Sequence, residues 1–219
     1  MEFKIENTIV FGLDRCVVSS GNSYRTELRT ADDLNDKDLV RADKLGSVQV
    51  GSGHDSFLNG ITIIADFTAP LYWWKQAQRY HWFEFVSSQS TMHCVTKFKL
   101  IDRCTKDVDQ RVLDIVQSMI DDYNTQEIVI KSQINDSLSL EALKMKHKEL
   151  WYKIIASLPC GFCLSATMTT NYRQIKTMCL QRKYHPLNEW HDFIKWACSL
   201  PNFSKMTGIT EWGIFKWNL

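Results

Sequence analysis

A polar and aromatic block at residues 69–93 holds the side chains of this sequence that are best suited to chemistry. It reads APLYWWKQAQRYHWFEFVSSQSTMH, and it combines aromatic rings with amide, guanidinium, imidazole and hydroxyl groups. Gln76 and Arg79 are three residues apart, so they would share one face of a helix. The hydroxyl-rich run 87–91 could wrap an anion with its backbone. The block therefore indicates a nucleotide site; the alternative is an amphipathic helix followed by a solvated loop.

A second set of polar residues lies near the carboxyl end, in the run NYRQIKTMCLQR. Asn171 and Arg182 are eleven residues apart, which on a helix leaves them within about 20° of each other. Arg173 lies near the expected helix start, where its guanidinium and the free backbone donors could both meet a phosphate. The alternative is that both arginines are solvated surface charges and that Asn171 only caps the helix.

Hydrophobic periodicity predicts the elements that must position these residues. A short apolar segment at 8–13 and the β-rich runs 61–67 and 163–170 are expected to be strands. Pro70 can occupy the first turn of a helix that runs through Arg79 and ends at the serine-rich loop. Further helices are expected from after Thr105 to near Tyr123, from near Ser139 to Leu158, and over 171–183 and 187–200.

Composition limits the class of protein. The 219 residues suit one domain over 1–219, and 44% hydrophobic with 23% charged residues is typical of a soluble globular protein. A net charge of +1 without a basic stripe argues against a polymeric nucleic-acid partner. The sequence shows no signal peptide and no long apolar span, so we expect a cytoplasmic protein without membrane contact.

The seven cysteines are scattered and odd in number, which favours reduced thiols over a disulfide framework. Cys160 and Cys163 form a CxxC pair. With no second pair and no nearby histidine, a zinc site would be incomplete, so we expect no metal. A redox role is a further alternative, but it needs an exposed thiol of low pKa, and the flanks here are apolar.

Taken together, these segments resemble the flavin-dependent thymidylate synthases, whose signature runs Gln-x-x-Arg-His-Arg and then Ser-x-Asn-Glu-x-Ser-x-Arg-Tyr. The matching stretch here is QAQRYHWFEFVSSQSTMH, with about one extra residue inside it. Upstream, GHDSF resembles the family's flavin-contacting His-Glu-Thr segment and FTAP its strand-to-helix entry. Downstream, NYRQIKTMCLQR resembles the family's Asn-x-Arg helix with its distal arginine. The resemblance covers roughly residues 50–200.

The resemblance implies a role for each matching residue. It places Arg182 at the uracil oxygens and lets Arg79 bridge nucleotide and flavin, so these two would carry catalysis. The residues implied for the deoxyuridine nucleotide are Gln76, Arg79, Ser88, Gln89, Ser90 and Arg182. Those implied for FAD are Ser56, Arg79, His81, Asn171, Arg173 and Thr177, the last standing where the family usually has a second Asn.

The resemblance also implies a fold and a reaction. The fold would be α/β, a single domain with a central sheet flanked by helices. The reaction would move a one-carbon unit from methylenetetrahydrofolate to C5 of dUMP, giving dTMP, with hydride from reduced FAD and with NADPH as the reductant of the flavin. Partners would be the small-molecule nucleotide and folate, and the assembly would be a homotetramer.

Several signature residues depart from the family. Tyr80 replaces its His and His81 its following Arg, Ser88 or Gln89 replaces its Glu, and Met92-His93 replaces the final Arg-Tyr. Ile155 stands where another phosphate-binding Arg is expected. A methionine cannot make the charge-assisted contacts of an arginine, so nucleotide handling is expected to differ.

These departures leave alternatives open. One is hydroxymethylation, in which water quenches the activated one-carbon adduct, or a different base such as dCMP. Another is a non-catalytic descendant of the fold that binds a nucleotide or a protein partner.

Overall fold

Four strands form one sheet in the order β1-β2-β4-β3. The computed structural model describes residues 1–132 and 137–211. The strands are β1 (Lys4–Phe11), β2 (Thr62–Pro70), β3 (Glu84–Ser88) and β4 (Cys163–Asn171). The helices are α1 (Leu13–Ser19), α2 (Asp36–Gly46), α3 (Leu71–Ala77), α4 (Thr91–Cys94), α5 (Gln110–Ser132), α6 (Ser137–Ser157), α7 (Tyr172–Arg182), α8 (Asn188–Ser199) and α9 (Phe203–Thr207). The expected α/β class, with helices packed on a central sheet, is confirmed.

The two central strands, β2 and β4, are antiparallel. Hydroxyl Oγ1 of Thr68 lies 2.7 Å from Oγ of Ser165, and Thr167 Oγ1 donates to Asp66 Oδ1 over 2.5 Å. Along β2 alternate residues are buried, as a strand with one face on a core requires. The expected strands 61–67 and 163–170 are therefore confirmed.

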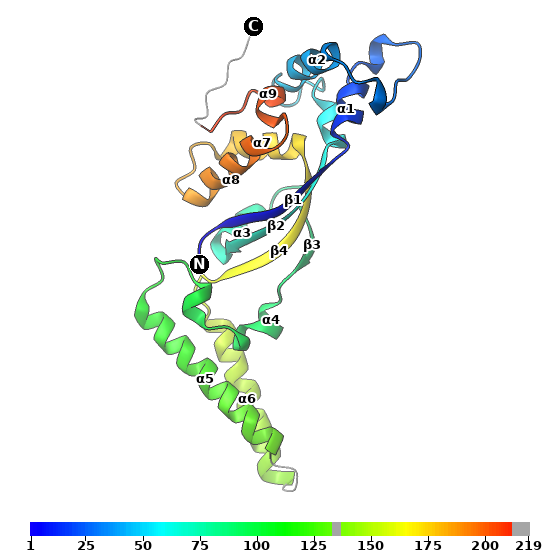
Figure 1. Ribbon diagram of the computed structural model, residues 1–219. Helices are drawn as coiled ribbons and strands as arrows, with labels where there is room; N and C mark the ends of the chain where they lie inside the picture. Colours follow the sequence, from blue (N-terminus) through cyan, green and yellow to red (C-terminus); the bar gives the residue numbers. More distant parts are fainter. Residues whose placement is uncertain (133–136, 212–219) are drawn as a thin grey trace. The chain divides into compact units, whose positions relative to one another are not determined.

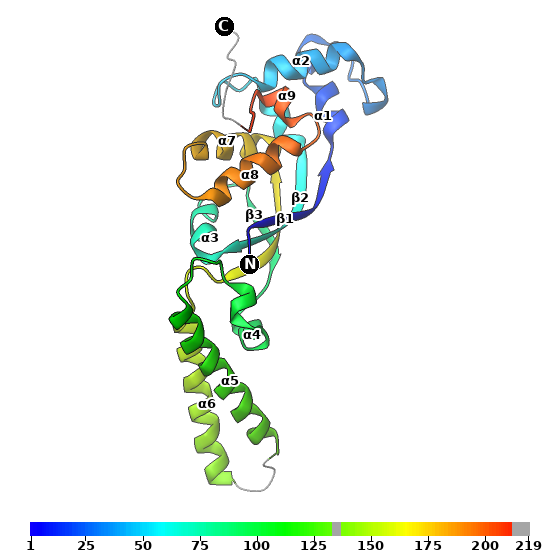
Figure 2. The same ribbon diagram turned by 60° about the vertical axis from the view of Figure 1, so that its left-hand side comes forward.

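The chain divides into two compact units. The hairpin unit comprises residues 1–2, 68–75 and 88–165, and the sheet unit comprises 3–67, 76–87 and the chain from 166 onward. In the hairpin unit, α5 and α6 run antiparallel side by side (Figures 1 and 2). Their core is a cluster of buried side chains: Val95, Leu100, Cys104, Leu113, Val116, Ile120, Ile154 and Phe162.

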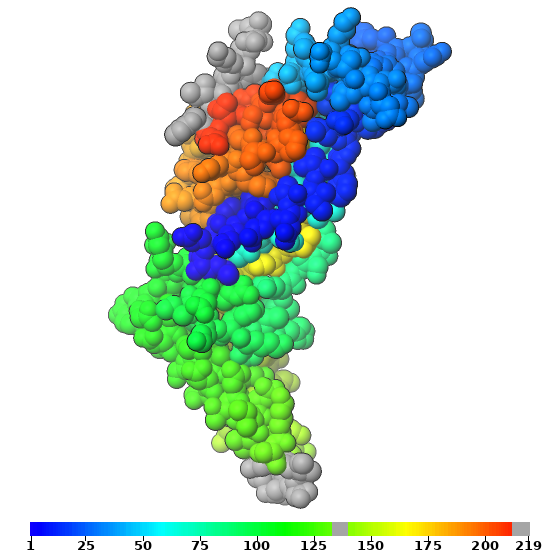
Figure 3. Space-filling view, viewed as in Figure 1, coloured from blue at the N-terminus to red at the C-terminus, as the bar shows by residue number. Residues whose placement is uncertain are grey.

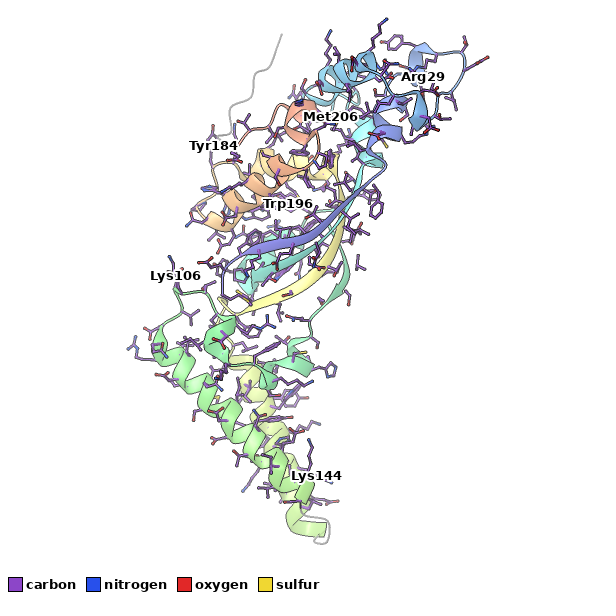
Figure 4. The ribbon with its side chains drawn as sticks, in the orientation of Figure 1. Arg29, Lys106, Lys144, Tyr184, Trp196 and Met206 are labelled. Atoms are coloured by element: carbon purple, nitrogen blue, oxygen red, sulfur yellow. The ribbon has the colours of Figure 1, made fainter. Side chains whose placement is uncertain are left out.

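In the sheet unit, α8 packs on the sheet through aromatic side chains. Phe67 of β2 has its ring centroid 6.4 Å from that of Phe193 and 5.4 Å from that of Trp196. Trp196, labelled in Figure 4, also donates from Nε1 to Thr8 Oγ1 of β1 over 3.0 Å. β1 is an edge strand, and Figure 3 shows its dark blue residues at the surface. Helix α8 thus contacts both β1 and β2.

Helix α2 carries a buried carboxylate that three arginines surround. Asp38 is 1% exposed, with Arg25 Nη2 at 2.6 Å, Arg29 Nη1 at 3.1 Å and Arg41 Nη2 in close contact. Burial alone would raise the pKa of Asp38, but the Arg41 hydrogen bond and the charges of Arg29 and Arg41 lower it below its usual value. Arg29 is labelled in Figure 4.

Several predicted boundaries are wrong. Pro70 ends β2 instead of opening a helix, and α3 ends at Ala77, so Arg79 lies in the following turn. The run 87–91 is not one loop, because Ser87 and Ser88 belong to β3 and Thr91 begins α4. Pairing with β4 extends this segment beyond β3, since the backbone N–H of Gln89 donates to the Ser165 carbonyl. Tertiary pairing overrides the turn-forming tendency of serine here.

Other predicted elements agree with the structure to within a few residues. The segment expected as a strand at 8–13 is β1, which begins earlier, at Lys4. It ends at Phe11 because Gly12 has a left-handed φ of 74° and turns the chain into α1. The helices expected near 139–158, 171–183 and 187–200 are α6, α7 and α8. The one expected from Thr105 to Tyr123 begins at Gln110 and extends to Ser132. In the described ranges no helix is long and apolar enough to cross a membrane.

Candidate active site

A cavity of about 530 Å³, which we call the α7 cavity, opens in the sheet unit where β4 meets α7. Its volume lies within the usual range of small-molecule sites. Its lining residues are Asn59, Thr62, Trp82, Glu84, Thr169, Thr170, Asn171 and Arg173. Two of the predicted flavin residues, Asn171 and Arg173, are therefore brought together in one cavity.

Asn171 has a structural role as well. Its Oδ1 accepts the backbone N–H of Gln174 over 2.9 Å, so it is the N-cap of α7. The capping role that the sequence allowed is confirmed, while Arg173 is not a solvated charge, because it pairs with Asp55. The same residue lines the α7 cavity, so capping and ligand contact are compatible here.

Arg173 is held by a buried carboxylate. Its Nε lies 3.0 Å from Oδ1 of Asp55, whose side chain is fully buried, and Oδ2 of Asp55 lies 2.8 Å from Nζ of Lys176. Lys176 is 1% exposed and also donates to the carbonyls of Gly46 and Val48. Burial lowers the pKa of Lys176, although the Asp55 hydrogen bond and charge act in the opposite direction. Two cations thus share one carboxylate beside the cavity, and this arrangement favours an anionic ligand.

Thr170 is a lining residue of the same cavity, but its hydroxyl oxygen is closed to solvent. The residue is 5% exposed, and its Oγ1 has no hydrogen-bond partner among the residues that the structure describes. A buried hydroxyl without a partner costs about 1–3 kcal/mol. Because the oxygen is not accessible from solvent, this cost belongs to the folded chain itself.

Trp82 lines the α7 cavity with a strained backbone. Its φ is 62°, a left-handed conformation that is rare for a large side chain, and the residue is 69% exposed. Such strain is concentrated at functional sites. An exposed indole at a cavity wall offers a flat surface to a planar ring.

A second cavity of about 410 Å³, which we call the Arg79 cavity, lies in the same unit. Its lining residues are Gln78, Arg79, Tyr80, His81, Phe83, Glu84 and Phe85. Arg79 and His81, both predicted for flavin, are exposed and share this cavity, and Glu84 lines both cavities.

Arg182 and Gln76 are linked through one buried tryptophan. Trp190 Nε1 donates to Gln76 Oε1 over 2.9 Å, and Cζ of Arg182 lies 4.8 Å from the centroid of a Trp190 ring. Arg182 Nε also donates to the hydroxyl of Tyr80 over 2.8 Å. The structure therefore brings together two residues that were both predicted to contact the nucleotide.

The remaining predicted flavin residues make local contacts. Ser56 is exposed, begins a short 3₁₀ helix, and donates from Oγ to the carbonyl of Gly53. Thr177 Oγ1 donates to the Arg173 carbonyl, one turn back on α7, over 3.1 Å. These hydroxyls are committed to their own backbone, so their flavin roles stay predictions.

Three predicted nucleotide residues belong to the hairpin unit. Ser88 is exposed at the end of β3, and Ser90 precedes α4, where its carbonyl accepts from the backbone of His93 and Cys94. Gln89 Oε1 accepts the backbone N–H of Ser165 over 3.1 Å. Their substrate roles stay predictions.

Two of the residues that replace family arginines, Met92 and Ile155, lie in the same unit. Ile155 packs against the buried cluster of the hairpin unit, which explains an apolar residue there. Met92 is 47% exposed, and its carbonyl accepts from Trp151 Nε1.

Sequence reasoning missed Asp55, Thr170, Lys176 and Trp82. Asp55 lies inside the GHDSF segment, and Lys176 lies one helical turn from Arg173, so both had a weak signal. Thr170 had none, because only the tertiary structure leaves its hydroxyl without a partner. Within the described residues, no group of three or more His, Cys, Asp or Glu side chains is placed to hold a metal.

No protein-family model and no curated protein matches the sequence. Solved structures do match over most of the chain. A thymidylate synthase X structure from Helicobacter pylori with FAD and dUMP is 12% identical, with 93% of this chain and 96% of that chain covered at a TM-score of 0.63. A second H. pylori structure, described as flavin-dependent thymidylate synthase ThyX with FAD and dUMP, is 13% identical, with 94% and 96% covered at a TM-score of 0.61.

A third match is a UMP/dUMP methylase, PolB from Streptomyces cacaoi, bound with 5-Br dUMP. It is 14% identical, with 96% of this chain and 93% of that chain covered at a TM-score of 0.56. At such identities the comparison speaks for the fold. The chain therefore has the fold of the flavin-dependent thymidylate synthases, the family that its sequence motifs resemble.

Proposed function

We propose that this chain is a flavin-dependent enzyme that transfers a one-carbon unit from methylenetetrahydrofolate to C5 of dUMP, with NADPH reducing the flavin. The observation that carries the proposal is the α7 cavity, which joins Asn171, Arg173 and the exposed indole of Trp82. This cavity occurs in a fold shared with structures determined with FAD and dUMP. Fold alone would not support an activity, so the site residues matter more.

The residues around the α7 cavity fit a flavin nucleotide. Arg173, fixed by Asp55, would contact a phosphate. Trp82 offers a flat surface to the isoalloxazine or adenine ring. Once bound and reduced, FAD supplies the hydride that converts a transferred methylene into a methyl group.

Arg182 is the residue best suited to the pyrimidine. Its Nη1 and Nη2 donate to no acceptor among the described residues, and it forms no ion pair with a carboxylate there. An uncommitted guanidinium can bind a uracil carbonyl and stabilise negative charge that develops on it. We propose that Gln76 and Arg79 complete the contacts to the nucleotide.

The first test is an absorbance spectrum of the purified protein, followed by titration of any bound flavin with dUMP. We expect a flavin band, present as purified or after added FAD, that dUMP perturbs. Arg182→Ala should then raise the activation barrier by about 2–4 kcal/mol. Arg111→Ala, at an exposed arginine of α5, is the matched control and should behave as wild type. Absence of any flavin affinity would rule the proposal out.

A non-catalytic descendant of the fold is the second candidate, and the placement of Ile155 and Met92 favours it. Ile155 lies against an apolar cluster and Met92 carries no charge, so neither can replace a phosphate-binding arginine. Full complementation of biological activity by Arg182→Ala would decide for this candidate. If turnover is found, the product mass distinguishes methylation from hydroxymethylation. A response to dCMP in place of dUMP would show that the substrate base is cytosine.

A further inference from the structure

Arg182 lies at the end of α7 between two aromatic side chains. Its Nε donates to Tyr80 Oη over 2.8 Å, and its Cζ is 5.4 Å from the Tyr80 ring centroid and 4.8 Å from a Trp190 ring centroid. The two aromatic rings meet edge to face, with their centroids 6.1 Å apart. The guanidinium is thus held by one hydrogen bond and two cation–π contacts.

Trp190 is itself immobilised. It is fully buried in α8, its Nε1 donates to Gln76 Oε1, and its ring packs edge to face on Phe193 with centroids 5.6 Å apart. A side chain with these contacts cannot change rotamer without breaking them. Trp190 is therefore a rigid surface for the guanidinium.

In the part of the chain that the structure describes, the positive charge of Arg182 is not balanced by a paired carboxylate. His185 lies next to Trp190, with ring centroids 6.2 Å apart, and its Nδ1 accepts the backbone N–H of Leu187. Burial lowers the pKa of His185, and the charge of Arg182 lowers it further. His191 acts on His185 in the same direction and Glu189 in the opposite one. No carboxylate within the described residues pairs with Arg182.

We propose that Tyr80 and Trp190 are positioning residues that fix the guanidinium of Arg182 and keep Nη1 and Nη2 available for the ligand. The aromatic contacts hold the cation without neutralising it, which a carboxylate partner would do. Tyr80 stands where the family signature has His, so this arrangement is a feature of this chain. The identity of the ligand rests on the proposed function, whereas the placement of Arg182 by Tyr80 and Trp190 does not.

The geometry can be tested without any ligand, by NMR of the arginine Nε–H groups in the full-length ¹⁵N-labelled protein. Arg182→Lys identifies the Arg182 signal by its loss. We expect that signal to be resolved and slow to exchange in the wild type, and to shift and exchange faster in Tyr80→Phe. Tyr184→Phe is the matched control, since Tyr184 is 84% exposed and stacks on Lys183 instead. A rapidly exchanging wild-type signal that Tyr80→Phe leaves unchanged would overturn the proposal.

The effect on the ligand is measured with dUMP as the probe. Tyr80→Phe should weaken dUMP binding about tenfold, the effect of losing one charge-assisted hydrogen bond, while flavin affinity and melting temperature stay near wild type. In an Arg182→Lys background, Tyr80→Phe should not weaken dUMP binding further. Lysine has no guanidinium Nε–H that Tyr80 could hold. Equal losses in both backgrounds, or loss of flavin and stability together, would show ordinary packing and contradict the proposal. A wild type that binds flavin but not dUMP would contradict the proposed substrate, and the NMR result would then decide on the positioning role.

Discussion

Arg173 and Arg182 are of the same residue type on the same helix, yet their surroundings give them different properties. Arg173 is paired with the buried carboxylate of Asp55, which fixes it and offsets part of its charge. Arg182 is held by aromatic rings and a phenol hydroxyl, which fix it and leave its charge intact. The first suits a permanent contact to a cofactor phosphate, and the second suits a contact whose charge matters to the reacting ring.

Replacing Thr170 with valine separates ligand binding from stability. Because the Thr170 hydroxyl is buried without a partner, Thr170→Val should leave the ligand-free protein unchanged or stabilise it by about 1 kcal/mol. The same change should leave FAD affinity unaltered, because the hydroxyl oxygen is closed to solvent. Urea unfolding and a flavin titration measure the two effects.

The control for this change is Thr125→Val on α5, where the hydroxyl already donates to the Asp121 carbonyl. It should leave FAD affinity unaltered. If Thr170→Val destabilises the protein, the hydroxyl has a structural role that its surroundings do not show.

At this scale, the placement of residues along one helix could be predicted. Asn171 is the N-cap of α7 and Arg182 is its last residue, as the sequence indicated, while their ligand roles stay predictions. Asp55 and Trp190 could not be predicted, because they reach α7 or Gln76 from distant parts of the chain. No local pattern encodes such pairing.

Helix α7 connects the fold to the candidate site, since its N-cap lines the α7 cavity and its last residue is Arg182. Asn171→Ala should destabilise the protein by about 1 kcal/mol, because a backbone donor in the first turn loses its acceptor. Asn171→Asp should keep the cap and the stability, but weaken FAD binding by bringing a negative charge to the phosphates. Chemical unfolding and flavin titration of both variants distinguish these roles.

Equal FAD affinity in wild type and Asn171→Asp would argue against a phosphate in the α7 cavity. Loss of stability in the aspartate variant as well would show that Asn171 does more than cap.

Helix α2 should make stability depend on pH. Asp38 has a lowered pKa in the folded protein, so it contributes stability that is present above about pH 4 and is lost as the pH falls through its folded pKa. Asp38→Asn should cost about 3 kcal/mol at pH 7, because three arginines lose their common carboxylate. The difference should shrink as the pH is lowered below 4 in urea titrations.

A stability difference between Asp38→Asn and wild type that stays constant from pH 7 to pH 2 would show that the charge of Asp38 does not carry the effect. Asp109→Asn is the exposed control, and its difference should be small throughout.

Helices and central strands could be predicted, but their ends at the candidate site could not. Apolar periodicity marked α6, α7 and α8, since each buries one stripe. Pro70 was misassigned because a proline is compatible with a helix start and a strand end alike. The β3 strand was missed because all five of its residues are exposed, so no alternation of burial marks it.

The molecule keeps a known fold at 12–14% identity. This is possible because burial pattern and topology, more than particular residues, specify a fold. The resemblance implies a homotetramer, and we predict that four chains of 25.5 kDa assemble to about 100 kDa in solution. Light scattering coupled to size-exclusion chromatography measures this mass, and a monomer at all concentrations would contradict it.

Lys176 gives the protein an internal reporter of its own opening. Its ammonium is enclosed by Asp55 and the carbonyls of Gly46 and Val48, so a reagent that acylates amines has no access to it in the folded state. Exposed lysines such as Lys144, labelled in Figure 4, react at once. The labelling rate of Lys176, followed by mass spectrometry, therefore measures how often the segment from Gly46 to Asp55 detaches from α7. A ligand that closes the α7 cavity would make this opening rarer and the labelling slower.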